Sequence, residues 1–320
     1  MKNIDEIFSS VEKDLAKFEE KRLSIKEKEK GLPLLIAPSV VCFILGIIGN
    51  SSLFFIGAVV GLPFLVKGLS KLTEVMKLKN EYTYKYKNEV VAKVIKSFDE
   101  EYEYNPASGI SKSEYLESKI FTTRPDRYST EDLVEGKYGN RGFKFAEIHS
   151  EYKTETRDKD GHRHVHWHTI FKGIFFIGEF NKNFNGYTLI YPDTAEKMLG
   201  IFGKSLQKLS FKGKLITLED PEFEKEFAVY SDDEVESRYI LSTSLMRRIL
   251  DYKIKNGKGI HLGFVDNKIY VAISNMKDCF EPDFSKSALD KTEIESYYND
   301  LKVVLDIIEE FNLDQKVFKN

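Results

Sequence analysis

The sequence predicts an α+β protein in which a two-helix membrane hairpin, extended by a helical stalk, precedes a domain of antiparallel sheet and packed helices. Three observations support this prediction: a long uncharged apolar run, helical periodicity on both sides of it, and short alternating segments further along. We expect four parts: an N-terminal stalk helix (1–31), the hairpin (32–72), a second stalk helix (73–104) and the α+β domain (105–320).

The apolar run extends from Leu32 to Val66 and contains no charged side chain. About 20 apolar residues suffice to cross a bilayer once, so a run of this length has room for more than one crossing. The polar stretch Asn50-Ser51-Ser52 divides it. We therefore expect two spans, at about residues 32–49 and 53–69. A re-entrant hairpin that dips into the bilayer without crossing it is the alternative.

Basic residues flank the run on both sides, whereas the turn between the spans is uncharged. The positive-inside rule then places both termini and the main domain in the cytoplasm. The two cysteines, Cys42 and Cys279, do not form a disulfide framework, which suits that reducing compartment. The basic residues are Lys21, Arg22, Lys26, Lys28 and Lys30 before the run, and Lys67, Lys71, Lys77 and Lys79 after it.

Apolar residues recur at helical spacing before the first span, as in a coiled-coil seam with one polar break. A second helical pattern follows the second span from Leu72 to Tyr102 and ends before Asn105-Pro106. The two stripes can be buried by an antiparallel pair of helices within one chain. Alternatively, the first stripe pairs with its copy in a second protomer. The seam consists of Ile4, Phe8, Val11, Leu15, Phe18, Arg22 and Ile25.

After Pro106 the pattern favours strands joined by tight turns, with helices between them. Asp158–Gly161 and Asp266-Asn267 are turn sequences between strand-like runs. The expected strands are 143–156, 162–178, 187–191, 214–218, 227–230, 260–265 and 268–273. The expected helices begin at the capping boxes 193–196 and 231–234 or cover 245–254 and 293–311.

Four histidines alternate with other residues in one predicted strand, so their side chains share a face. Two of them and a third ligand can hold Zn²⁺, and we expect the hairpin to bring Glu155 near His164 as that ligand. The favoured interpretation is an exposed polar face with Val165 and Trp167 turned inward, because no other part of a metal signature is present. The metal candidates are His162, His164, His166, His168 and Glu155.

Other chemistry finds little support. The acidic run 219–226 lacks the spacing of an EF-hand and is expected to be a solvated turn with Phe223 and Phe227 buried. The sequence contains no nucleophile elbow, phosphate-binding loop or dinucleotide fingerprint. A net charge of −3 gives no argument for nucleic acid. We therefore expect no catalytic residue, no cofactor and no nucleic-acid partner.

From the stalk onward the chain resembles a bacterial family known as domain of unknown function 3137. Of the histidine ladder, only His168, next to Trp167, fits the family pattern. The resemblance implies a two-span bacterial membrane protein with a cytoplasmic domain, and it implies no activity. The residues that carry it are Tyr104-Asn-Pro106, Gly109-Ile110, Asp126–Tyr128, Glu131–Leu133, Phe171–Phe176, Phe180–Lys182, Asp220–Lys225, Val229–Ser231, Arg238–Leu241 and Phe280–Pro282.

We thus expect a protein of the bacterial inner membrane that presents a cytoplasmic binding domain to a protein partner or to itself, without catalysis. The bilayer is its second expected partner. One alternative is a metal-dependent hydrolase that uses the histidine ladder. The other is a structural membrane oligomer assembled through the N-terminal seam.

Overall fold

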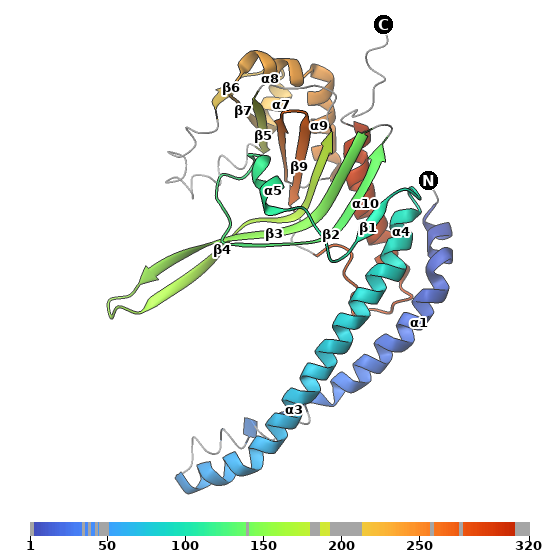
Figure 1. The fold of residues 1–320 in the computed structure, drawn as a ribbon, viewed down its shortest axis with the longest axis vertical. Coiled ribbons are helices and arrows are strands. Elements are labelled where there is room, and N and C mark those ends of the chain that lie inside the picture. The colour runs from blue at the N-terminus through green and yellow to red at the C-terminus, as the bar shows by residue number, and fades with distance from the viewer. Residues whose placement is uncertain are drawn as a thin grey trace. The chain divides into compact units, whose positions relative to one another are not determined.

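The computed structural model describes residues 3–33, 36–37, 40–41, 44, 51–138, 141–179, 186–192, 213–256, 259–274 and 278–310. This part of the chain is α+β, as expected, with a large antiparallel sheet and several helices (Figure 1). Two compact units are present. The helical unit consists of Met1–Ser97 and Phe280–Tyr297, and the sheet unit of Phe98–Cys279 and Tyr298–Asn320.

The helical unit begins with a helix that is capped by its own sequence. The Asn3 side chain accepts the Glu6 N–H at 2.9 Å, and the Glu6 carboxylate accepts the Asn3 N–H at 3.2 Å, which is a capping box. This helix is α1 (Ile4–Lys30). Three further helical segments follow one another directly: α3 (Ser51–Tyr86), the π-helical turn η1 (Lys87–Val91) and α4 (Ala92–Lys96).

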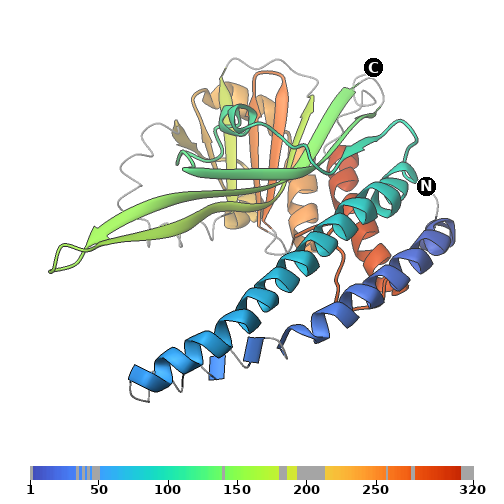
Figure 2. The ribbon, with the colours of Figure 1, turned by 60° about the horizontal axis from the view of Figure 1, so that its bottom comes forward.

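Helix α1 packs antiparallel to α3 and η1 (Figures 1 and 2). Two ion pairs join α1 to the helices packed against it: Lys28–Glu74 (2.6 Å) to α3 and Asp14–Lys93 (2.5 Å) to α4. The sequence predicted Ile4 and Phe8 as buried residues of the seam, but both are only partly buried. Ile7 is buried instead. The buried side chains of α1 are Ile7, Val11, Leu15, Phe18, Arg22 and Ile25.

The intrachain pairing that the sequence allowed is therefore confirmed. The Phe18 ring lies 5.3 Å from the Tyr82 ring and 5.2 Å from the Tyr86 ring, both of the same chain. Because the seam is buried within one chain, a second protomer is not needed to cover it.

Within the described residues, no helix combines the length and the apolar character needed to cross a membrane. The two expected spans are therefore not confirmed. The first, residues 32–49, falls largely outside the part that the structure describes. The second, residues 53–69, lies in α3, which continues without a break into the stalk.

The second stalk helix is shorter than expected. It ends with α4 at Lys96, and Glu103–Asn105 form strand β1 where the sequence predicted helix up to residue 104. Tyr104 pairs with Val134 of a neighbouring strand. The helical spacing of the apolar residues continues past Lys96, but this long-range pairing determines the backbone there.

The sheet of the second unit is antiparallel throughout its described strands, in the order β1-β2-β3-β4-β9-β8-β5-β7-β6. Two hairpins that the sequence predicted, β3–β4 and β8–β9, are confirmed. The bounds are β1 (Glu103–Asn105), β2 (Arg127–Tyr138), β3 (Arg141–Arg157), β4 (Arg163–Glu179), β5 (Tyr187–Pro192), β6 (Lys214–Ile216), β7 (Phe227–Ser231), β8 (Ile260–Val265) and β9 (Lys268–Ser274).

The remaining helices partly follow the prediction. Helix α8 has Asp233 as its N-cap, because Ser231 still belongs to strand β7. The capping box expected at 193–196 lies outside the described residues. Strands β1 and β2 and helices α5 and α7 were not predicted from the sequence. The helix bounds are α5 (Lys112–Glu117), α7 (Pro221–Glu226), α8 (Glu234–Ile240), α9 (Thr243–Asn256) and α10 (Lys291–Glu310).

An aromatic core lies against one face of the sheet, beneath α5. The Tyr115 ring of α5 lies 5.4 Å from the Phe175 ring of β4, and its hydroxyl is 2.9 Å from Ser150 Oγ of β3. The Tyr191 hydroxyl donates to the Ile120 carbonyl at 2.7 Å. Since these buried polar atoms have partners, they cost little to bury and hold the middle of β3 and β4 in place.

Candidate functional site

The β3–β4 hairpin extends well beyond its neighbouring strands, and we call residues 152–169 the hairpin arm. Strand β2 pairs with β3 only as far as Glu151, and β9 pairs with β4 only from Gly173 onward. Figures 1 and 2 show the arm projecting away from the sheet as a two-stranded ribbon. A register shift next to Glu151 marks its base. Such a bulge bends a strand and increases its twist.

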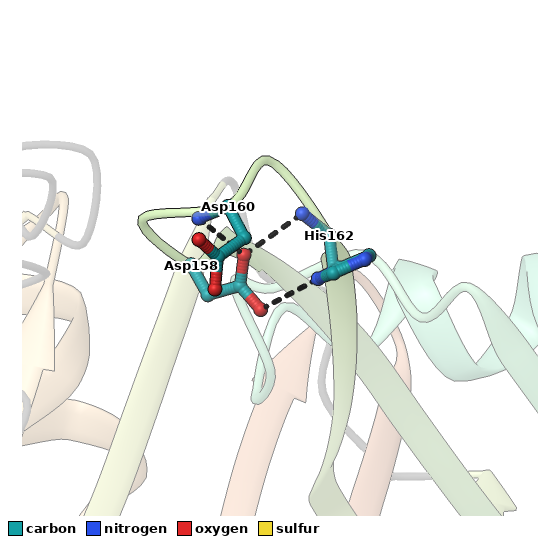
Figure 3. A group of neighbouring side chains, drawn as sticks. All are labelled: Asp158, Asp160 and His162. Atoms are coloured by element: carbon teal, nitrogen blue, oxygen red, sulfur yellow. Dashed lines mark hydrogen bonds and ion pairs between the residues drawn. The ribbon is translucent and has the colours of Figure 1, made fainter.

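The turn at the end of the arm is organised by Asp158. Its Oδ1 accepts the backbone N–H of Asp160 at 3.0 Å and that of His162 at 2.8 Å (Figure 3). Gly161 has φ +85°, a left-handed conformation that glycine adopts without strain. These contacts explain why Asp158–Gly161 forms a turn, and they fix the direction of the Asp158 carboxylate.

Two of the four histidines converge on the second oxygen of that carboxylate. Asp158 Oδ2 lies 3.2 Å from His162 Nδ1 and 3.1 Å from His164 Nε2. Hydrogen bonding from His164 and from the His162 backbone lowers the pKa of Asp158. Asp160 brings a second carboxylate oxygen into the same small cluster (Figure 3). Asp158 and Asp160 were not among the metal ligands predicted from the sequence, although both belong to the predicted turn.

The other end of the ladder makes different contacts. His168 Nε2 lies 2.8 Å from Thr154 Oγ1, and the His168 ring stacks on Tyr152 at 4.9 Å. His166 faces Thr154 across the ribbon. His164, His166 and His168 alternate along β4 and share one face, whereas His162 precedes the strand. Asp158 contacts His162 and His164.

Glu155 is not where the sequence placed it. The cross-strand neighbour of His164 is Thr156, whereas Glu155 faces Val165. Because side chains alternate between the two faces, Glu155 points away from the histidines. It instead accepts hydrogen bonds from Arg163, which together with Lys153 lowers its pKa. Glu155 therefore does not complete a histidine site and is not the third ligand that the hydrolase hypothesis required.

The two apolar residues of the ladder strand also differ from expectation. Val165 is 44% exposed, so it is not turned into a core. Trp167 is partly covered by the Arg127 guanidinium, which lies 3.5 Å above its ring in a cation–π contact. This contact lies near the base of the arm, where β2 ends.

The acidic run is used structurally. Residues 221–226 form α7, and the Asp220 side chain caps it by accepting the N–H groups of Glu222 and Phe223. Glu226 pairs with Lys253 at 2.5 Å, and Phe223 and Phe227 are buried, as expected. The run thus serves as a helix start, not the turn that was predicted.

Comparison with known proteins identifies one family. Residues 169–313 match the model described as "Protein of unknown function (DUF3137)". This part of the chain is therefore similar to that family. The match confirms the resemblance found in the sequence for this range, and it begins immediately after the fourth histidine. The histidines of the hairpin arm and helices α1 and α3 lie outside it.

No curated protein matches the chain. Among solved structures, the chain is similar to the mycobacterial trehalose monomycolate transport factor A, TtfA, with 8% sequence identity and a TM-score of 0.31. That likeness covers 67% of this chain and 95% of the other. At this score it carries no argument about the fold or function of this protein.

Proposed function

We propose that this protein is attached to the bacterial inner membrane through the end of its helical pair and presents its sheet unit to a protein partner in the cytoplasm. One observation carries the membrane part of the proposal. Helix α3 has no polar side chain from Val59 to Val66, and its described large side chains there are exposed.

The exposed side chains surround the helix axis. Residues 62–66 are all exposed, and five consecutive residues of an α-helix point in every direction around it. A helix that is hydrophobic all round is normally found in a large core or in a membrane. Single exposed apolar residues are ordinary, whereas a continuous apolar surface marks an interaction site. The exposed apolar residues are Val59, Leu62, Phe64, Leu65, Val66, Leu69 and Leu72.

The helix changes character beyond Leu72. Val75 is buried against the rest of the helical unit, and the ion pairs Lys28–Glu74 and Lys79–Glu29 (2.7 Å) begin there. Lys67 and Lys71 lie at the border, where long basic side chains can reach lipid headgroups. This sequence of an uncharged end, a basic border and a charged amphipathic stretch supports lipid as the partner of the apolar end and the cytoplasm as the side of the sheet unit.

The partner-binding part of the proposal is supported by the hairpin arm. Within the hairpin arm, neither β3 nor β4 pairs with another of the described strands on its outer edge. Open strand edges are surfaces to which another chain can add a strand.

Membrane attachment is tested by fractionating cells that produce the full-length protein. We expect it in the membrane fraction after washing with high salt and with alkaline carbonate. The variant Leu62→Glu/Val66→Glu should shift to the aqueous fraction, because a charged side chain in the bilayer centre costs about 2.5–3.5 kcal/mol. Met76→Glu is the matched control, since Met76 is 57% exposed but lies in the amphipathic part of α3. Wild-type protein that stays aqueous without detergent overturns the proposal.

The orientation is tested by cysteine labelling with a maleimide that does not cross membranes. Val235 on α8 is 79% exposed, so Val235→Cys reports the sheet unit, whereas the native Cys279 is buried and would be protected on either side. We expect Val235→Cys to react only after the cells are permeabilised. Labelling of Val235→Cys in intact cells contradicts a cytoplasmic sheet unit.

A further inference from the structure

We propose that the end of the hairpin arm binds one divalent transition-metal ion, with Zn²⁺ as the ion that fits best, through Asp158, Asp160 and His162, whose ligand atoms lie within 4.8 Å of one another. His164, whose Nε2 lies 3.1 Å from Asp158 Oδ2, supplies the fourth ligand. This site is independent of membrane attachment and of the family match, which begins further along the chain.

Two distances between ligand atoms are close to those of a tetrahedral zinc site. Zn²⁺ binds histidine nitrogen and carboxylate oxygen at about 2.0–2.2 Å, so neighbouring ligand atoms in a tetrahedral site lie roughly 3.4 Å apart. Asp158 Oδ2 is 3.2 Å from one ring nitrogen and 3.1 Å from the other. An ion bound by Asp158 Oδ2 and these ring nitrogens takes the place of the two hydrogen bonds.

The carboxylate is already oriented for this role. Its Oδ1 is held by the N–H groups of Asp160 and His162, which directs Oδ2 toward the two imidazoles (Figure 3). Hydrogen bonds to the atoms behind a ligand fix its orientation and raise metal affinity.

The donor set discriminates between metals. Imidazole nitrogen suits Zn²⁺ and other transition ions, whereas Mg²⁺ and Ca²⁺ prefer sites made of oxygen ligands. His162 and His164 are 75% and 55% exposed, so the ion remains open to water. Its structural effect is to tie the turn to strand β4 at the end of a ribbon that has no third strand.

The proposal is tested on the full-length chain purified without an affinity tag, by titration with Zn²⁺ and by the visible absorption of Co²⁺ as a tetrahedral probe. We expect one Zn²⁺ per chain. Asp158→Asn keeps Oδ1, and with it the turn, but replaces Oδ2 by an amide nitrogen. Asp158→Asn and His164→Ala should each weaken binding at least tenfold and remove the Co²⁺ absorption.

His166→Ala is the matched control, because His166 shares the face of the ladder but faces Thr154. It should change the affinity by less than twofold. Absence of stoichiometric Zn²⁺ binding to the wild type overturns the proposal, and so does equal weakening by His166→Ala and His164→Ala, which would indicate general binding to a histidine-rich strand. Thermal unfolding without metal verifies that the variants are folded. Zn²⁺ should slow amide exchange at residues 158–164 in the wild type but not in Asp158→Asn.

Discussion

Arg22 occupies the polar break of the N-terminal seam and is buried there. Its guanidinium donates to both carboxylate oxygens of Glu19, at 2.8 and 2.7 Å, and to the Phe284 carbonyl at 3.1 Å. Glu19 in turn accepts the Ala288 N–H at 2.7 Å. The hydrogen bond from Arg22 lowers the pKa of Glu19 to about 2. A residue that interrupts the apolar pattern thus holds a distant segment of the chain against α1.

Arg22→Ala should destabilise the helical unit by about 3–5 kcal/mol, because it leaves the largely buried Glu19 carboxylate without its charged partner. Lys17→Ala is the control: Lys17 makes an exposed ion pair with Asp14 on the same helix, and its loss should cost less than about 1 kcal/mol. Urea unfolding followed by circular dichroism measures both. Similar losses for the two variants would show that the Arg22 pair contributes no more than a surface pair.

Glu147 is a buried carboxyl of strand β3 with incomplete hydrogen bonding. Its Oε2 accepts the Cys279 N–H at 2.9 Å, whereas Oε1 has no hydrogen-bond partner among the described residues. Burial raises the pKa of Glu147 to about 8, and the nearby Asp132 and Asp278 add to the effect. The folded protein therefore binds the proton of Glu147 more tightly than the unfolded chain does.

Glu147 should therefore contribute most to the stability of the sheet unit below pH 4.5, the ordinary glutamate pKa. This contribution should fall as the pH rises from 4.5 to about 8. Each pKa unit of difference corresponds to about 1.4 kcal/mol. Glu147→Gln should reduce this decline and be more stable than the wild type at pH 8. Identical pH profiles of the two proteins would contradict this account.

At the scale of elements, aromatic packing joins α1 to α3. Phe18 is 1% exposed and contacts the rings of Tyr82 and Tyr86, which also stack on each other with centroids 5.9 Å apart. Each of these rings comes from a helical stripe that the sequence already showed. What the structure adds is their register: residue 18 meets residues 82 and 86 within one chain.

Phe18→Ala should cost about 3–5 kcal/mol of unfolding free energy, as expected for removal of a buried phenylalanine. Leu23→Ala is the matched control on the same helix, because Leu23 is 53% exposed, and it should cost far less. Unfolding by urea measures the two values. If instead Phe18→Ala dissociates an oligomer in detergent while its unfolding midpoint is unchanged, the intrachain packing of α1 is not what stabilises the seam.

At the scale of the whole molecule, the chain leaves the helical unit after Ser97 and returns to it at Phe280. The returning segment reaches Arg22 and Lys26 through the carbonyls of Phe284 and Ser285. The Phe284 ring also lies 4.8 Å from the Tyr82 ring. The family model covers this segment together with much of the sheet, so its boundaries do not coincide with the compact units.

Phe284→Ala should therefore loosen the helical unit and not the sheet strands that precede it in sequence. We expect the amide protons of Phe18–Ile25 to exchange faster, with a loss of about 1–3 kcal/mol in local opening free energy. Exchange in β8 and β9 should stay unchanged and is the internal control. Faster exchange mainly in β8 and β9 would assign the segment to the sheet unit instead.

Local features of this protein were determined by its sequence alone. The α1 seam, the turns at Asp158–Gly161 and Asp266-Asn267, and most strands after residue 140 depend on spacing, caps and turn residues, which act over a few positions. The short elements α5, α7 and β1 were not predicted, because so few residues do not form a recognisable pattern of helix or strand.

Only the tertiary structure decided which distant groups meet. Strand register put Thr156, not Glu155, opposite His164, and turn geometry brought Asp158 to both imidazoles. The partner of Arg22 came from a segment more than two hundred residues away. A shift of one residue in register moves every side chain to the other face of a strand, and no local pattern records that choice. Periodicity shows which side of an element is buried, whereas packing of the whole chain determines what is buried against it.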